Sequence, residues 1–309
     1  MKIVYMGTPD FSVLPLEKLI ENYDVVAVVT QPDKMVGRKK EIKYSPVKEF
    51  SIKNNIKILQ PEKIKEDYKE IIDLNPDIII TCAYGQIIPK ELLDFPKYGC
   101  INIHASLLPK LRGGAPIHKA IIDGYDKTGV TIMYMDEKMD SGDIIYQEEI
   151  KIENTDTAGS LFDKLSILGS NMIIKVLPSI INNTNSRIKQ DENEVTYAYN
   201  ITREEEKIDF NKNTKEVYNK IRGLYPWPVG YSTLEGKKVK IYKSEIGISE
   251  KNGENGEIIN IYDNALGIKT NDGEIKILEL QFEGKKEISV KDYLNGIQDK
   301  SKLLGKIFK

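Results

Sequence analysis

DIIITCAYG, residues 77–85, and GCINIHA, residues 99–105, are two runs in which most side chains are apolar. Strands of a parallel sheet have this composition, because helices cover both faces of such a sheet. Two similar runs precede them, KIVYMG at 2–7 and DVVAVVT at 24–30, with a helical pattern at 12–22 between those two. The alternation predicts an α/β fold with a doubly wound, mostly parallel, Rossmann-like sheet.

One more strand and a long helix follow before the composition changes. GVTIMYM at 129–135 is typical of a strand, and residues 158–180 place leucines at helical spacing until Pro178 and a polar stretch end the helix. Residues 182–206 are polar and irregular. We therefore predict a first domain over 1–181 and a linker over 182–206.

Short strands dominate the last third of the chain. A helical segment ends at a Pro-Trp-Pro turn, and several short runs with alternating apolar side chains come after it. The turn Asn271-Asp272-Gly273 separates two of these runs and is a strong hairpin signal. Short strands at close spacing predict a small, OB-like β-barrel as a second domain over 207–309.

The net charge of the chain does not indicate a partner, but one segment is strongly basic. The 309 residues carry 45 Lys and Arg against 47 Asp and Glu, which gives a net charge of −2. A protein with this balance binds nucleic acid only through local patches. Residues 34–43, KMVGRKKEIK, hold five Lys or Arg and one Glu. This run is either a solvated loop or a loop that binds phosphate.

The sequence gives no signal for a membrane, a disulfide or a metal. The N-terminus lacks the apolar core and cleavage site of a signal peptide, and no apolar run approaches the roughly 18–20 residues that span a bilayer. Cys82 and Cys100 lie in apolar runs without CxxC spacing. We expect a cytoplasmic, monomeric protein that needs no metal.

The polar residues of the run at 99–105 are the first candidates for chemistry. Asn102 and His104 are two positions apart on one predicted strand, so both side chains project from the same face near its carboxyl end. The following SLLPKLRGGAP forms a loop in which Gly113 and Gly114 permit a ligand to approach the backbone. Two buried residues with local hydrogen bonds are the alternative interpretation.

A carboxylate near the histidine would strengthen the catalytic interpretation. Asp136, Asp140 and Asp143 follow the strand at 129–135. A neighbouring carboxylate orients an imidazole and favours its charged form. Periodicity leaves open which of the three aspartates reaches His104.

NIHASLLPKLRGGAPI at 102–117, followed by TGVTIMYMDEKMDSGDII at 128–145, resembles the signature of the 10-formyltetrahydrofolate-dependent formyltransferases. The resemblance implies a catalytic triad of Asn102, His104 and Asp140, and 10-formyltetrahydrofolate as co-substrate. It places folate against a loop formed by Ser106, Leu107, Leu108 and Pro109. It also places folate near Tyr84, Gly85 and Ile87 of the AYGQIIP segment.

TQPDKMVGRKKEIKYSPVK at 30–48 resembles the basic loop of those family members that formylate the methionine carried by initiator tRNA. The match extends through YPWPVGY at 225–231 and covers nearly the whole chain, although this basic loop lacks a proline often seen there. The resemblance implies formation of formylmethionyl-tRNA for translation initiation. The expected tRNA contacts are Arg38, Lys39 and Lys40 in the loop and Lys238 and Lys240 in the second domain.

The resemblance also assigns roles to the triad. The amine of methionine is the nucleophile, so the protein supplies none. Asn102 donates a hydrogen bond to the oxyanion that attack on the formyl carbon creates. His104 stabilises the same oxygen and relays protons to the departing folate nitrogen. Asp140 orients His104 and takes up the proton of the amine.

Two other functions remain open from the sequence. Formyltransferases that act on glycinamide ribonucleotide or on amino-sugars share the triad, but the basic loop and the predicted barrel argue against them. A tRNA-binding module without catalytic activity would explain the basic loop and the barrel. It would leave Asn102, His104 and Asp140 unexplained.

Overall fold

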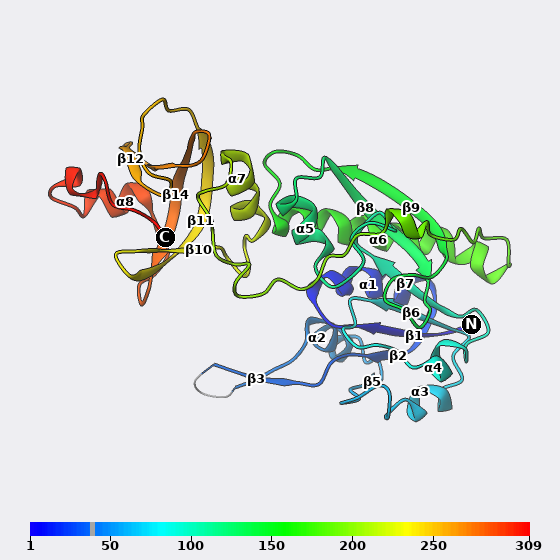
Figure 1. Cartoon of the computed structure of the whole chain (residues 1–309). Helices are drawn as coiled ribbons and strands as arrows, with labels where there is room; N and C mark the ends of the chain where they lie inside the picture. The colour runs from blue at the N-terminus through cyan, green and yellow to red at the C-terminus, as the bar shows by residue number, and fades with distance from the viewer. Residues whose placement is uncertain (38–40) are drawn as a thin grey trace. The chain divides into compact units, whose positions relative to one another are not determined.

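The computed structural model of the chain describes residues 1–37 and 41–309 (Figure 1). Its contacts divide it into two compact units. The first comprises Met1–Pro116, Lys127–Lys151 and Phe162–Tyr199. The second comprises Ile117–Asp126, Ile152–Leu161 and Asn200–Lys309. Arg38, Lys39 and Lys40, three of the expected tRNA contacts, lie outside the described residues.

Among the described residues, the first unit contains a seven-stranded sheet with the order β5-β2-β1-β6-β7-β8-β9. Its strands are β1 (Lys2–Gly7), β2 (Asp24–Val29), β5 (Ile58–Leu59), β6 (Ile78–Cys82), β7 (Cys100–His104), β8 (Lys127–Tyr134) and β9 (Ile144–Lys151). The pairs from β5 through β7 are parallel, whereas β7–β8 and β8–β9 are antiparallel. The predicted doubly wound, mostly parallel sheet is confirmed.

The strand order places a switch point at the centre of the sheet. From β1 the chain builds outward to β2 and β5 on one side and to β6 and β7 on the other. Ligands of open α/β sheets bind beyond the carboxyl ends of the strands near such a point. The loops after β6 and β7, which hold most of the predicted site residues, begin at this edge of the sheet.

The sequence did not indicate β9. Only its first residues are buried, and the remaining side chains are partly or fully exposed. An edge strand of this kind shows neither a continuous apolar run nor a clean alternation, so periodicity does not detect it.

Helices and a buried apolar cluster complete the first unit. The helices are α1 (Val13–Asn22), α2 (Pro46–Lys53), α3 (Lys69–Asp73), α4 (Lys90–Leu93) and most of α6 (Ala158–Ile181). Side chains of β1, β2 and β6, including Val4, Val29 and Ile79, pack against Leu92 of α4 in this cluster. β3 (Lys34–Val36) and β4 (Glu41–Lys43) form a separate antiparallel pair.

The helix predicted over 158–180 is confirmed as α6, which contains Pro178 and ends at Ile181. By length and composition alone α6 could cross a membrane, contrary to the expectation that no segment reaches that length. Half of its most apolar window is buried inside the fold.

The second unit contains a small barrel. Its elements are α5 (Pro116–Ile122, except for its first residue), α7 (Thr214–Gly223), β10 (Tyr231–Leu234), β11 (Lys237–Gly247), β12 (Ile258–Ile261), β13 (Leu266–Lys269), β14 (Glu274–Phe282), β15 (Ile288–Ser289) and α8 (Val290–Asn295). The sheet order is β10-β11-β14-β13-β12, and β15 pairs with β14. The C-terminal residues bridge both ends, because Phe308 pairs with Leu234 and Ile307 with Glu257. This bridging closes the sheet into the predicted barrel.

Candidate active site

Asn102 and His104 lie on β7, in the interior of the sheet. Asn102 pairs with Thr81 of β6 and Met133 of β8 in the strand register, and His104 pairs with Thr131 of β8. Both side chains are nearly enclosed, with exposed fractions of 9% and 5%. A buried polar side chain requires hydrogen-bond partners, so its contacts define how it is oriented.

The amide of Asn102 is oriented by its neighbour on β6. Thr81 Oγ1 donates a 2.8 Å hydrogen bond to Asn102 Oδ1. Asn102 Nδ2 then faces the other way and lies 3.4 Å from Asp140 Oδ1. Because the carbonyl end is engaged by Thr81, the amide presents its N–H groups toward Asp140.

The imidazole of His104 is held between a carbonyl and a carboxylate. Nε2 donates to the backbone oxygen of Leu111 at 3.1 Å. A carbonyl only accepts, so this contact places a hydrogen on Nε2. Nδ1 lies 3.6 Å from Asp140 Oδ2. Nδ1 is therefore the nitrogen that faces Asp140.

Of the three aspartates after β8, Asp140 is the one that contacts the pair. Its Oδ2 also accepts a 2.8 Å hydrogen bond from the backbone N–H of Gly113. Asp143 instead pairs with Arg187 at 3.1 Å, and Asp136 accepts from Ser141 Oγ at 2.6 Å. The structure thus brings Asn102 and His104 of β7 together with Asp140 from the loop after β8.

A tight turn positions Asp140. Its φ of +51° lies in the left-handed region, which aspartate tolerates better than most side chains. A Cβ at Gly142 would lie only 2.0 Å from the backbone oxygen of Tyr134, so only glycine fits there. Gln190 Nε2 donates to the backbone oxygens of Asp140 and Gly142 at 2.8 and 2.9 Å.

The SLLP segment has two inward and two partly exposed side chains. Ser106 Oγ donates to the backbone oxygen of Lys110 at 2.6 Å, and Ser106 is fully buried. Leu108 is buried with Met133 and Ile144. Leu107 and Pro109 remain partly exposed. Ser106 and Leu108 therefore shape the loop, while Leu107 and Pro109 are the members with surface to offer a ligand.

A second segment, from the predicted linker, pairs with the loop after β7, called here the catalytic loop because the predicted roles of Asn102 and His104 point to it. The backbone of residues 196–198 forms a short parallel ladder with residues 111–115, through Arg112 N–H to the oxygen of Thr196 (2.9 Å) and Ala198 N–H to the oxygen of Arg112 (2.7 Å). The guanidinium of Arg112 is buried and donates to Gln190 Oε1 at 2.8 Å and Glu192 Oε1 at 2.9 Å. These residues hold the loop that carries Leu111 and Gly113.

The loop after β6 contains one buried and two exposed candidates. Tyr84 is buried, and within the part of the chain that the structure describes its hydroxyl has no hydrogen-bond partner. Burial raises the pKa of Tyr84 to about 12. Gly85 is exposed at a φ of +90°, and Ile87 is 66% exposed. A buried donor without a partner is costly, so the Tyr84 hydroxyl suits a polar ligand.

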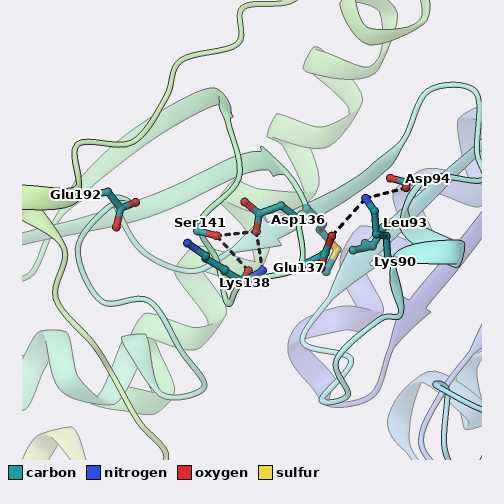
Figure 2. A pocket seen from close by; sticks show the side chains of 9 residues that line it. Lys90, Leu93, Asp94, Asp136, Glu137, Lys138, Ser141 and Glu192 are labelled. Atoms are coloured by element: carbon teal, nitrogen blue, oxygen red, sulfur yellow. Dashed lines mark hydrogen bonds and ion pairs between the residues drawn. The ribbon is translucent and has the colours of Figure 1, made fainter.

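A cavity of about 700 Å³ lies between α4 and the loop after β8, and neither Tyr84, Gly85 and Ile87 nor the SLLP residues line it (Figure 2). Leu93 and Met135 give it apolar walls, and both pack in the cluster that contains Tyr84. Lys90 pairs with Asp94 at 3.0 Å and with Glu137 at 3.3 Å across its rim. The other lining residues are Asp136, Lys138, Ser141 and Glu192. Six of its nine lining residues are charged, whereas most sites for small organic molecules have mainly apolar walls.

The expected second-domain tRNA contacts share one face of β11. Lys238 and Lys240 are partly exposed and alternate with the buried Val239 and Ile241. Lys238 Nζ lies 3.6 Å from the centroid of the Tyr231 ring, which is a cation–π contact. The cation of Lys238 is thus already partly engaged, whereas Lys240 lies beside Tyr231 in the strand register.

Three further titratable groups do not contribute to the site. Burial raises the pKa of Cys82 and of Cys100 to about 12, so both thiols stay protonated. In the described part of the chain, no group of three or more His, Cys, Asp and Glu could hold a metal ion. His118 is buried on α5, and its Nδ1 lies 2.8 Å from the backbone oxygen of Gly223.

Sequence reasoning missed the residues that position the triad. Thr81 is the only polar residue of the buried strand β6, and a lone hydroxyl in an apolar run indicates a buried hydrogen-bond partner. Gln190 and Arg112 gave no signal, because their partners are about 50 and 80 residues away in the chain. Contacts of this range have no periodicity to reveal them.

Comparisons with known proteins agree with this geometry. The family model "Formyl transferase" matches residues 1–177, and "Formyl transferase, C-terminal domain" matches residues 200–298. A methionyl-tRNA formyltransferase of Bacillus thuringiensis subsp. konkukian (strain 97-27) is 54% identical over 300 residues, which cover 96% of each chain.

Two solved structures share the fold. A sugar 3N-formyl transferase, crystallised with dTDP and 5-N-formyl-THF, is 25% identical with a TM-score of 0.67 and covers 93% of this chain and 99% of its own. An N-formyltransferase of Helicobacter canadensis, in complex with folinic acid and dTDP-3-aminofucose, is 24% identical with a TM-score of 0.67 and covers 90% and 98%. Together with the family models and the 54% identical relative, these likenesses establish that the chain belongs to the formyl transferase family, in its methionyl-tRNA formyltransferase branch.

Proposed function

We propose that this protein transfers the formyl group of 10-formyltetrahydrofolate to the α-amino group of methionyl initiator tRNA, which yields formylmethionyl-tRNA for translation initiation. The observation that carries the proposal is the convergence of Asn102, His104 and Asp140 at the carboxyl edge of the sheet. The 54% identical relative supports methionyl-tRNA as the acceptor.

In this proposal the three side chains divide the chemistry. Asn102 presents its N–H groups to the formyl oxygen, where negative charge develops as the amine attacks. Its orientation by Thr81 supports this role, because a fixed donor needs no reorganisation during the reaction. His104 stabilises the same oxygen and moves a proton through Nδ1 toward the departing nitrogen. Asp140 orients His104 and receives the proton that the amine releases.

The folate co-substrate would bind beside the triad, at the loops after β6 and β7. Tyr84, Gly85 and Ile87 on one side, and Leu107 and Pro109 on the other, are the proposed contacts, with Ser106 and Leu108 shaping the loop. The buried hydroxyl of Tyr84, which has no hydrogen-bond partner among the described residues, supports this placement. Folate supplies the formyl group, and the side chains bind the folate, orient it and exclude water from it.

The tRNA would bind through positive charge and the second domain. We propose that Arg38, Lys39 and Lys40 contact phosphates, with Lys240 and, to a lesser degree, Lys238 adding contacts on the barrel. In this proposal, residues 1–181 form the catalytic domain, residues 182–206 form a connecting segment and residues 207–309 form the tRNA-binding domain. For phosphate contacts of this kind, the logarithm of the binding affinity falls linearly with the logarithm of the salt concentration.

We further propose that the protein acts in the cytoplasm as a monomer. Two buried free cysteines are compatible with a reducing compartment. Sedimentation equilibrium at several concentrations would test the second point, with a mass of 35.2 kDa expected for the monomer.

The acceptor is tested by a direct assay. The purified protein is given 10-formyltetrahydrofolate together with charged initiator tRNA, glycinamide ribonucleotide or an amino-sugar nucleotide. We expect formylation of the tRNA alone. Asn102→Ala should lower kcat by about 10²–10³-fold with an unchanged circular dichroism spectrum, the loss typical for one oxyanion donor. Formylation of another acceptor in preference, or near-wild-type turnover by the variant, would refute the proposal.

A further inference from the structure

Two tyrosines in the segment beside the catalytic loop are stacked on each other and face solvent. The rings of Tyr197 and Tyr199 lie parallel, with an interplanar angle of 2° and centroids 5.5 Å apart. Tyr197 is 49% exposed and Tyr199 is 62% exposed. Aromatic side chains this exposed and mutually ordered form a flat apolar surface that water covers in the free protein.

The backbone of the same segment is fixed, so the tyrosine pair is held in place. Residues 196–198 run beside residues 111–115, and side chains alternate across the segment. Thr196 Oγ1 accepts from the backbone N–H of Leu111 at 2.9 Å, and Ala198 is fully buried. Tyr197 and Tyr199, which flank Ala198, therefore project outward from a segment anchored on its other side.

The loop that anchors this segment also contacts His104 and Asp140. The backbone oxygen of Leu111 accepts from His104 Nε2, and the backbone N–H of Gly113 donates to Asp140. Gly113 lies against Ala198, because a Cβ added to it would be 2.7 Å from the Ala198 backbone oxygen. The segment that carries the two tyrosines is thus the direct backbone neighbour of the loop that contacts His104 and Asp140.

We infer that the Tyr197–Tyr199 pair is a stacking platform for the unpaired 3′-terminal base of the tRNA that carries the methionine. The inference rests on the proposed function. The reacting amine is separated from the terminal ribose by one aminoacyl unit, which spans about 3.5 Å along a chain. The terminal nucleotide must therefore lie at the mouth of the site. An unpaired base exposes its faces, and parallel tyrosine rings extend a stack of this kind.

Stacking differs from phosphate binding in its salt dependence, and this difference makes the inference testable. Loss of a phosphate contact reduces the slope of log affinity against log salt concentration. Loss of a stacked base lowers affinity and leaves that slope unchanged, because no counterion is released by the contact.

The experiment uses the full chain with Tyr197→Leu, Tyr199→Leu and the double variant. Tyr23→Leu is the matched control. Tyr23 is the C-cap of α1 and immediately precedes β2, so it lies at the amino ends of the parallel strands, opposite the carboxyl ends that carry the candidate site. The double variant should raise KM for methionyl-tRNA by about 5- to 150-fold, the range for one stacked base. KM for 10-formyltetrahydrofolate and the salt slope should not change. Tyr197→Phe and Tyr199→Phe keep the ring and should restore the affinity.

A spectroscopic readout reports the contact itself. Methionyl-tRNA with 2-aminopurine as its terminal base should lose fluorescence when it binds the wild-type protein and should lose less with the double variant. The inference is overturned if the double variant binds this tRNA with wild-type affinity and quenching. It is equally overturned if the variant raises KM for the folate instead. Failure of the wild-type protein to formylate methionyl-tRNA would refute the proposed function, which is a distinguishable result.

Discussion

The backbone N–H of Gly113 donates a 2.8 Å hydrogen bond to Asp140 Oδ2, the oxygen that lies 3.6 Å from His104 Nδ1. A main-chain group of the loop after β7 therefore fixes the carboxylate that faces the histidine. Because a backbone donor has no rotamers, this contact orders Asp140 without dependence on another flexible side chain.

Gly113→Ala should disturb this contact. Gly113 has a φ of +125°, and a Cβ there would lie 2.7 Å from the Ala198 backbone oxygen, so the loop must move. We expect a loss of stability of roughly 1–2 kcal/mol from the backbone conformation alone, together with a lower kcat. Urea unfolding and steady-state kinetics measure both effects. Gly114→Ala is the control, because Gly114 is exposed and its φ is not positive; equal losses in the two variants would contradict the argument.

Thr81→Val should reduce kcat without changing either KM. Valine keeps the shape of threonine but cannot donate to Asn102 Oδ1, so the amide is free to turn its oxygen toward the formyl group. The loss should be about tenfold or more, and smaller than the 10²–10³ expected for removing the donor. Thr81→Ser retains the hydroxyl and should retain most of the activity. A Thr81→Val enzyme with unchanged kcat would show that Thr81 does not set the amide orientation.

Gln190→Leu should uncouple the turn that carries Asp140 from the segment of residues 190–198. The variant removes both donors to the backbone oxygens of Asp140 and Gly142 and the acceptor for the buried Arg112. Since Gln190 is partly exposed, we expect a loss of about 1–2 kcal/mol in unfolding free energy.

Glu192→Gln is the comparison for this experiment. It weakens only an ion pair whose carboxylate is largely exposed, which is worth less than about 1 kcal/mol. Denaturant unfolding of both variants, with kcat measured in parallel, should rank Gln190→Leu as the more harmful. The reverse order would assign the structural role to Glu192.

Tyr84→Phe should stabilise the free protein and weaken folate binding. The hydroxyl is buried and has no partner among the described residues, so its removal should gain about 1 kcal/mol. If the hydroxyl binds folate, KM for 10-formyltetrahydrofolate rises. The free variant should therefore unfold at a higher temperature, while its affinity for the donor falls and its donor KM rises. A variant that is less stable and has an unchanged donor KM would show that the hydroxyl has another partner.

The same residue predicts a dependence on alkaline pH. Because burial raises the pKa of Tyr84 to about 12, the unfolded chain loses this proton near the ordinary value of 10 while the folded chain keeps it. The free energy of unfolding should fall as pH rises from 10 to 12, since the folded state then binds more protons. In Tyr84→Phe the free energy of unfolding should fall less steeply with pH, because the contribution of this one titrating group is missing. Parallel curves for the two proteins would contradict the assignment.

His118 predicts a loss of stability at acid pH. Burial lowers the pKa of this histidine below its ordinary 6.5, although its contact with the Gly223 backbone oxygen opposes the shift. Below pH 6.5 the unfolded chain binds a proton that the folded chain does not, so the unfolding free energy should fall as pH drops from 6.5 to the folded pKa. His118→Gln should reduce this dependence in urea unfolding between pH 7.5 and 5.5. An unchanged slope would show that the pKa of His118 is the same in the folded and unfolded states.

The sequence by itself determined the parallel sheet, the barrel and the candidate pair on β7. Apolar runs at 77–85 and 99–105 and the hairpin turn at 271–273 are local signals, because each depends on residues a few positions apart. Asn102 and His104 were recognisable for the same reason, since two residues two positions apart on a strand share a face.

Only the tertiary structure decided which groups complete the site. Asp140 rather than Asp136 or Asp143 contacts His104, because the tight turn at Gly142 aims one carboxylate back toward β7. Residues 196–198 belong with the catalytic loop through hydrogen bonds that span more than 80 positions of the chain. Such contacts arise when the folded chain brings distant backbone donors and acceptors together, and no periodicity along the sequence encodes them.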